Sequence, residues 1–182
     1  MSGVGEASLV LGIISSIIAI IDATKQIYDA VEDEGGLPEN FKKSSAKLPL
    51  ISNLLRDAER YVDDMTNEVD KAAFLLTLKD CKFQASQLKK LFEKVIPEEG
   101  ASRMDRYVKA ARTIGKGGRV ESLMSGILDS LHLLTMKFPQ ITKPGDKKLL
   151  TEAITEVLEM EPSLPDSKSL SVSQLGRFFL IK

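Results

Sequence analysis

Apolar residues recur every three to four positions along most of the 182-residue chain. This spacing is that of helices with one apolar face, and the strict alternation typical of strands is nowhere sustained. Gly and Pro divide the pattern into segments. These segments predict helices over about 8–31, 38–48, 49–64, 67–95, 102–114, 119–137 and 146–160. The sequence therefore predicts an all-α bundle of about five to seven helices.

Punctuating residues set the expected helix boundaries. We expect Ser8 and Ser102 to cap two of the helices and Pro49 to break the chain between two others. The longest predicted helix, 67–95, has apolar residues at intervals that place them on one side. We expect that side to face the core, with Ala73, Leu76, Cys81, Leu88, Leu91, Phe92 and Val95.

Residues 9–21 differ from every other segment, because they carry no charge and are apolar all round a helix. The large aliphatic residues of this run are Leu9, Val10, Leu11, Ile13, Ile14, Ile17, Ile18, Ile20 and Ile21. A helix with this pattern is expected to be buried on every side, which makes it the central helix of the bundle. Small residues (Gly12, Ser15, Ser16 and Ala19) permit close packing in protein or in lipid.

The same run raises the question of membrane insertion. Thirteen residues span about 20 Å as a helix, less than an ordinary transmembrane helix of about 20 apolar residues needs. A signal peptide is not expected either, because the preceding residues include Glu6 and contain no Lys or Arg. Two interpretations remain open: a permanent core helix, or a helix that moves between the core and a bilayer.

Composition narrows the chemistry. The formal net charge is −1, which gives no general attraction to nucleic acid. One cysteine, Cys81, and one histidine, His132, leave little for metal binding or catalysis, and we expect Cys81 to pack in the core and His132 to be partly buried. The GKGGR segment at 115–119 lacks the spacing of a phosphate-binding P-loop and is expected to be a turn. We expect no catalytic residues, no metal site, no cofactor and no enzymatic activity.

A basic zone lies between residues 103 and 119. Asp105 is the one acidic residue within it. Such a zone is either a solvated helix surface or a contact for anionic lipid headgroups. The residues that would make these lipid contacts are Arg103, Arg106, Lys109, Arg112, Lys116 and Arg119.

The order of these segments resembles a known family. The matching stretches are LVLGIISSIIAIIDATKQIYDAV, GGLPENFKKSSAKLPLISNLL and CKFQASQLKKLFEKVIPEEGASRMDRYVKAARTIGKGGRVESLMSGILDSLHLL. They are similar to the N-terminal domain of fungal NACHT and other STAND-type NTPases, the SesA or HeLo-like family. That family is related in architecture to the HeLo domain of the HET-S protein and to the four-helix bundle of the mixed lineage kinase domain-like protein. The resemblance covers about residues 7–165.

The resemblance implies a function. Such domains act in fungal programmed cell death and innate immunity, including heterokaryon incompatibility, by self-association and membrane permeabilisation through the hydrophobic first helix. It implies a cytoplasmic resting state, a move to the plasma membrane on activation, and acidic lipids, further copies and a downstream NACHT or NB-ARC domain or NLR protein as partners. The alternative is a protein-binding adaptor bundle whose first helix never leaves the core. We expect the bundle over 1–161 and a linker or flexible tail over 162–182.

Overall fold

A computed structural model describes residues 2–98 and 100–165, with side chains from Gly5 onward. The described residues form seven α-helices and one short 3-10 helix and contain no strand, which confirms the predicted all-α bundle. The helices are α1 (Ser2–Asp29), α2 (Glu39–Ser45), α3 (Leu48–Val62), α4 (Glu68–Val95), α5 (Arg103–Ile114), α6 (Val120–Lys137) and α7 (Pro144–Leu158), with η1 (Pro139–Ile141) between the last two.

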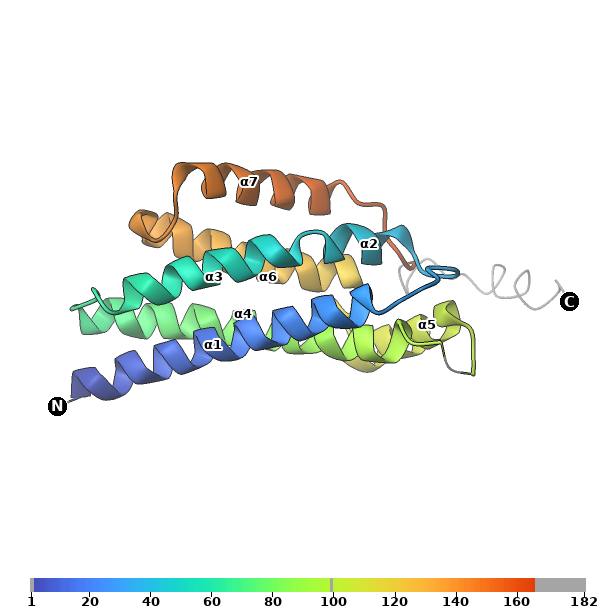
Figure 1. Ribbon diagram of the computed structural model, residues 1–182, viewed down its shortest axis with the longest axis horizontal. Helices are drawn as coiled ribbons and strands as arrows, with labels where there is room; N and C mark the ends of the chain where they lie inside the picture. The colour runs from blue at the N-terminus through green and yellow to red at the C-terminus, as the bar shows by residue number, and fades with distance from the viewer. Residues whose placement is uncertain (1, 99, 166–182) are drawn as a thin grey trace, which may run out of the picture.

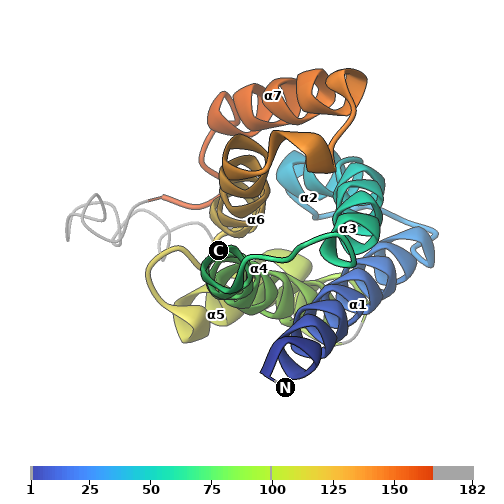
Figure 2. The same cartoon turned by 90° about the vertical axis from the view of Figure 1, so that its left-hand side faces the viewer.

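Four long helices, α1, α3, α4 and α6, lie side by side along the bundle (Figure 1). Helix α4 packs against α1 on one side and α6 on the other, so it occupies the middle. Helix α7 covers α6 on the side of the bundle opposite α1 (Figure 2). Helix α5 packs against the second half of α4, where Nη1 of Arg106 donates to the carbonyl oxygen of Lys94 at 3.0 Å.

The local signals in the sequence account for most boundaries. Asn67 caps α4, because its Oδ1 accepts a hydrogen bond from the backbone N–H of Val69 at 2.9 Å. Ser102 caps α5 in the same way, as predicted. Pro49 lies in the first turn of α3, so the chain breaks before it. The prediction for Ser8 is wrong: α1 already begins at Ser2, and Ser8 lies within the helix.

The turn between α5 and α6 contains the GKGGR segment. Gly115 and Gly117 have φ of 93° and 83°, conformations that L side chains rarely adopt. A Cβ on Gly118 would lie 2.3 Å from the carbonyl oxygen of Ala111, so this glycine permits the turn to pack on α5. The segment is therefore the interhelical turn that the sequence predicts.

The core runs the length of the bundle and contains aromatic clusters towards both ends. The Phe41 ring contacts Phe92 at 5.3 Å and meets the edge of Tyr107 at 4.9 Å. Phe74 and Phe138 form a second contact at 5.2 Å. Cys81 is fully buried, as expected.

Two expectations about side-chain burial are wrong. Leu76 is 67% exposed, because it lies on the side of α4 that faces away from the core. His132 is also exposed, on the outer side of α6. The expected tail begins at 162; Ser163 and Leu164 contact the bundle, and residues 166–182 lie outside the described part of the chain.

Candidate functional site

Helix α1 packs on the bundle through one stripe of side chains. Val10, Ile14, Ile17 and Ile21 are buried at spacings of four, three and four residues. This is the 3.6-residue period of a helix with a single buried face. The stripe lies against α4 and α3.

The rest of α1 is not buried, so the expectation of burial on every side is wrong. Leu9 is 58% exposed. Gly12 and Ala19 are exposed too, and they lie on the side of α1 that faces away from the core, whereas the exposed Ser15 lies at its edge towards α3. The physical reason is that this outward side has small residues, which lower the apolar area in contact with water without adding charge. The remaining large aliphatic residues flank the buried stripe and are partly buried: Leu11, Ile13, Ile18 and Ile20.

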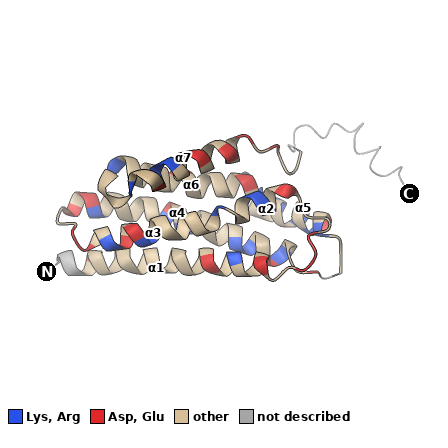
Figure 3. Ribbon diagram, turned by 45° about the horizontal axis from the view of Figure 1, so that its top comes forward, with Lys and Arg blue, Asp and Glu red and all other residues tan. Residues whose placement is uncertain are grey.

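Helix α1 is also longer than its uncharged run. The segment Gly5–Asp29 has 25 residues and a mean hydropathy of 2.1 in its most apolar window, of which 28% is buried. Twenty-five residues extend about 37 Å, which exceeds the roughly 30 Å of a bilayer core. By length and composition α1 is a candidate membrane span, which corrects the expectation based on residues 9–21 alone. Figure 3 shows the first half of α1 as a largely uncharged ribbon.

Polar contacts tie the flank of α1 to α3. Asp22 accepts a hydrogen bond from Ser52 Oγ at 2.7 Å and pairs with Arg56 at 3.1 Å. Ser15 Oγ donates to Glu59 at 3.2 Å. These contacts are partly exposed, so they orient α1 more than they stabilise it.

The basic zone divides into two groups. Arg103 is 6% exposed, and its guanidinium donates to the carbonyl oxygens of Ile96 at 3.0 Å and Gly35 at 2.9 Å. Arg106 is bonded to the carbonyl oxygens of Ala101 and Lys94. Both arginines hold the loops around α5 together, and the burial of Arg103 makes it unavailable to a lipid headgroup.

The second group consists of Lys109, Arg112 and Lys116. These side chains are exposed and form no hydrogen bond or ion pair with any residue that the structure describes. Arg119 lies at the start of α6 and is half-buried. Of the six residues predicted to contact lipid headgroups, these three are therefore exposed cations with no partner among the described residues.

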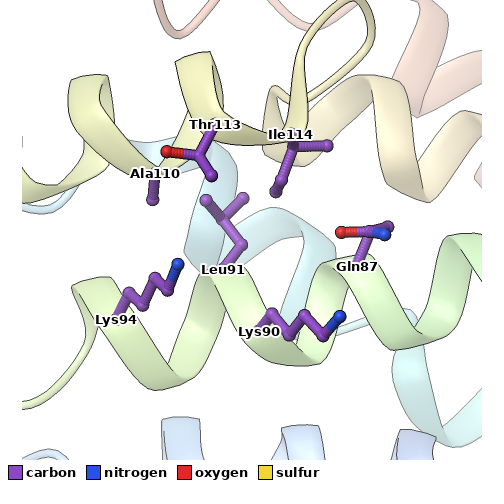
Figure 4. A pocket seen from close by; sticks show the side chains of 7 residues that line it. All are labelled: Gln87, Lys90, Leu91, Lys94, Ala110, Thr113 and Ile114. Atoms are coloured by element: carbon purple, nitrogen blue, oxygen red, sulfur yellow. The ribbon is translucent and has the colours of Figure 1, made fainter.

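A groove of about 290 Å³ runs between α4 and α5. Figure 4 shows Lys90, Lys94 and Gln87 on α4 opposite Thr113 on α5. Leu91 and Ala110 are buried and form its floor. The sequence analysis missed Lys90 and Lys94; their spacing of four residues, one helical turn, is the signal that could have shown them.

A buried polar network lies where α2, α5 and α6 meet the C-terminal end of the described chain. The carboxylate of Glu121 accepts hydrogen bonds from Asn40 Nδ2 at 3.0 Å, Ser163 N at 2.9 Å and Ser163 Oγ at 2.6 Å. Tyr107 Oη contacts Ser163 Oγ and accepts the backbone N–H of Val120 at 3.0 Å. Burial raises the pKa of Tyr107 to about 12. The network fixes the segment after α7 to the bundle.

The described residues give no sign of a metal centre. Among residues 2–98 and 100–165, no group of three or more His, Cys, Asp or Glu side chains is placed to hold a metal ion. Burial raises the pKa of the Cys81 thiol to about 12, so the thiol is protonated at neutral pH and is a poor nucleophile.

Comparison with known proteins places the chain in a family. No curated protein and no solved structure gives a significant match. The model of the SesA family, described as the N-terminal domain on NACHT NTPases and P-loop NTPases, matches residues 14–134. The match runs from the buried stripe of α1 to near the end of α6 and covers more than half of the chain. The chain therefore belongs to the SesA family of N-terminal domains on NACHT and P-loop NTPases.

Proposed function

We propose that this domain is a non-enzymatic effector that permeabilises membranes through α1 after self-association. A SesA domain stands at the N-terminus of an NTPase, which is the place of a domain that a nucleotide-driven assembly brings together. The observation that carries the proposal is the position of α1: a helix long and apolar enough to cross a bilayer, with 28% of its most apolar window buried. An ordinary surface helix has charged residues opposite its buried stripe, whereas the first half of α1 has none there to oppose entry into a bilayer.

The resting state follows from the buried stripe of α1. Burying Val10, Ile14, Ile17 and Ile21 contributes together about 6–12 kcal/mol. Helix α1 therefore stays on the bundle until another apolar environment is offered, from lipid or from further copies of the chain.

The proposal includes the setting that the family resemblance implies. The domain rests in the cytoplasm of a fungal cell and moves to the plasma membrane when its NACHT partner assembles. There it acts in programmed cell death, in the manner of the HeLo domain and of the four-helix bundle of the mixed lineage kinase domain-like protein. The alternative is an adaptor bundle that binds proteins and keeps α1 in place.

Forced assembly of the chain distinguishes the membrane effector from the adaptor bundle. The chain is fused to an inducible oligomerisation domain and added to dye-loaded vesicles that contain phosphatidylserine. We expect dye release on induction, and none from the oligomerisation domain alone. Oligomers that form, as light scattering shows, but release no dye would refute the membrane role and favour the adaptor.

A further inference from the structure

The outward side of α4 carries a line of exposed apolar side chains. Val69, Leu76 and Phe83 are 75%, 67% and 60% exposed. They follow one another at intervals of seven residues, which is close to two helical turns, so they point in nearly the same direction. Neighbouring members are about 10 Å apart along the helix axis, so they form a row of separate apolar side chains and not one continuous patch.

The same line becomes basic further along α4. Lys90 follows Phe83 at the same interval, and Lys94 follows one turn later. Neither lysine makes an ion pair or a side-chain hydrogen bond with a described residue. Both line the groove beside α5, so they lie next to Thr113. Arg112 lines the adjoining hollow of α5 together with Thr113, Lys109 and Asp105, so two further cations and one carboxylate lie there.

The neighbouring helices leave the apolar half of this line uncovered. Helix α5 lies along the second half of α4, next to residues 87–94. Helix α6, which packs against α4, carries two more exposed apolar side chains, Leu133 at 55% and Met136 at 68%. The outward row of α4 therefore runs from three apolar side chains to two lysines, with the exposed Lys79 and Asp80 beside Leu76.

The arrangement of side chains along α4 distinguishes between two possible occupants of this surface, a partner helix and a lipid bilayer. A partner helix packed as a coiled coil needs a second apolar row three or four residues after the first. Those positions on α4 are occupied by Ala72, Ala73, Lys79, Asp80, Ser86 and Gln87. Apart from Ala72 and Ala73 this row is charged or polar, so beyond Val69 a second helix finds no second apolar row to pack against. An anionic bilayer needs no such row: separate apolar side chains enter the boundary between headgroups and acyl chains, and cations meet the lipid phosphates.

We propose that the outer surface of α4 and α5 is a docking surface for anionic lipid bilayers, distinct from α1. We call it the α4–α5 docking face and define it by Val69, Leu76, Phe83, Lys90, Lys94 and Arg112. The proposal rests on the proposed membrane role of the domain, but it concerns the folded monomer with α1 in place. Docking through this face lays α4 along the membrane and brings α1, which packs against α4, close to the lipid.

The test measures binding of the unassembled chain to vesicles with and without phosphatidylserine, by co-sedimentation. We expect the double variant Leu76→Ser, Phe83→Ser to lower the partition coefficient at least tenfold. The matched control is Leu149→Ser, Leu158→Ser on α7, whose side chains are 49% and 72% exposed and which lies across the bundle from α1. The control should bind as the wild type does. Thermal unfolding confirms that both variants fold.

The second part of the test changes the charge of the docking face. Lys90→Glu with Lys94→Glu should lower binding at least tenfold, and added salt should lower that of the wild type. The control reverses two other exposed lysines, Lys42 and Lys143. Equal binding to neutral vesicles, or equal effects of test and control variants, would overturn the proposal. So would loss of self-association in lipid-free solution by the Leu76, Phe83 variant, because a second copy would then cover the face.

The outcomes separate this inference from the proposed function. If forced oligomers release dye but the docking variants bind as the wild type does, the docking face is refuted and the function of α1 stands. If the unassembled chain binds anionic vesicles through the docking face but forced oligomers release no dye, the docking face stands and the role of α1 is refuted. If the wild type neither binds nor releases dye, both are refuted.

Discussion

Ala19→Lys tests the function of α1 without disturbing the fold. Ala19 lies on the exposed side of α1, near the middle of the segment Gly5–Asp29. In the folded bundle the new ammonium group extends into water, and an exposed substitution of this kind changes the free energy of unfolding by about 0.5 kcal/mol or less. A charge at this position therefore acts on insertion and not on folding.

The cost in the membrane is much larger. A lysine at the centre of a membrane-spanning helix costs about 2.5–3.5 kcal/mol on insertion scales. After the small effect on folding is subtracted, about 2–3 kcal/mol remains. Since about 1.4 kcal/mol is a factor of ten, insertion should fall roughly 30- to 150-fold. Dye release by forced oligomers should fall with it.

The assay measures dye release and thermal unfolding on one preparation. The control is Asn53→Lys, which adds the same charge at an exposed position on the neighbouring helix α3. We expect it to unfold and release dye as the wild type does. If Ala19→Lys releases dye at the wild-type rate, α1 does not enter the bilayer through its middle. A fall of many degrees in its unfolding temperature would show instead that Ala19 is not on a free surface, which would refute the assignment of the two sides of α1.

Three further predictions concern the bundle itself. Ile17→Ala should lower the free energy of unfolding by about 2–4 kcal/mol in urea titrations, because Ile17 is fully buried, whereas Leu9→Ala should change it by less than about 0.5 kcal/mol. Glu121→Gln should lower the free energy of unfolding by about 1–3 kcal/mol, because a neutral amide accepts weaker hydrogen bonds than the carboxylate and adds a donor beside Asn40. In limited proteolysis the same variant should be cleaved faster between residues 160 and 165. Burial raises the pKa of Cys81 from 9.0 to about 12, so the thiol ionises at lower pH in the unfolded chain than in the folded one. The free energy of unfolding should therefore fall as the pH rises between these two values. Cys81→Ala should make that fall shallower, and an unchanged slope would contradict the raised pKa of Cys81.

The sequence predicted the class of fold because its boundaries are local. Pro49 and Gly115 set helix boundaries through the conformation of their own backbone, whatever the rest of the chain does. The start of α1 was placed six residues late, because Ser8 resembles a cap and lies within an uninterrupted helix. A capping residue marks a helix start only when the preceding residues are not helical themselves.

Which apolar residues are buried was harder to predict than the helix boundaries, and α4 shows why. Leu76 and Leu78 are equally apolar, yet one is 67% exposed and the other is fully buried. Apolar residues stand on several sides of α4, so the period of the pattern does not select one. The Glu121 network could not be predicted at all, since it joins residues 40, 121 and 163, and no local pattern links them.

The two sides of α1 differ in side-chain size more than in polarity, and this bears on why the proposed function needs self-association. The outward side is made of small uncharged residues such as Gly12 and Ala19, so it meets water at little cost and meets lipid at little cost. When α1 inserts, its inward stripe moves from the protein core into hydrocarbon, and the transfer free energy of Ile14 and Ile17 is close to zero. What a departing α1 leaves behind is costly, because the surfaces of α3 and α4 that it covers become exposed. Lipid around α1 does not cover those surfaces, whereas a neighbouring copy of the bundle can. Under the proposed function, assembly is therefore required to stabilise the bundle that remains, and a single copy on a membrane should keep α1 in place.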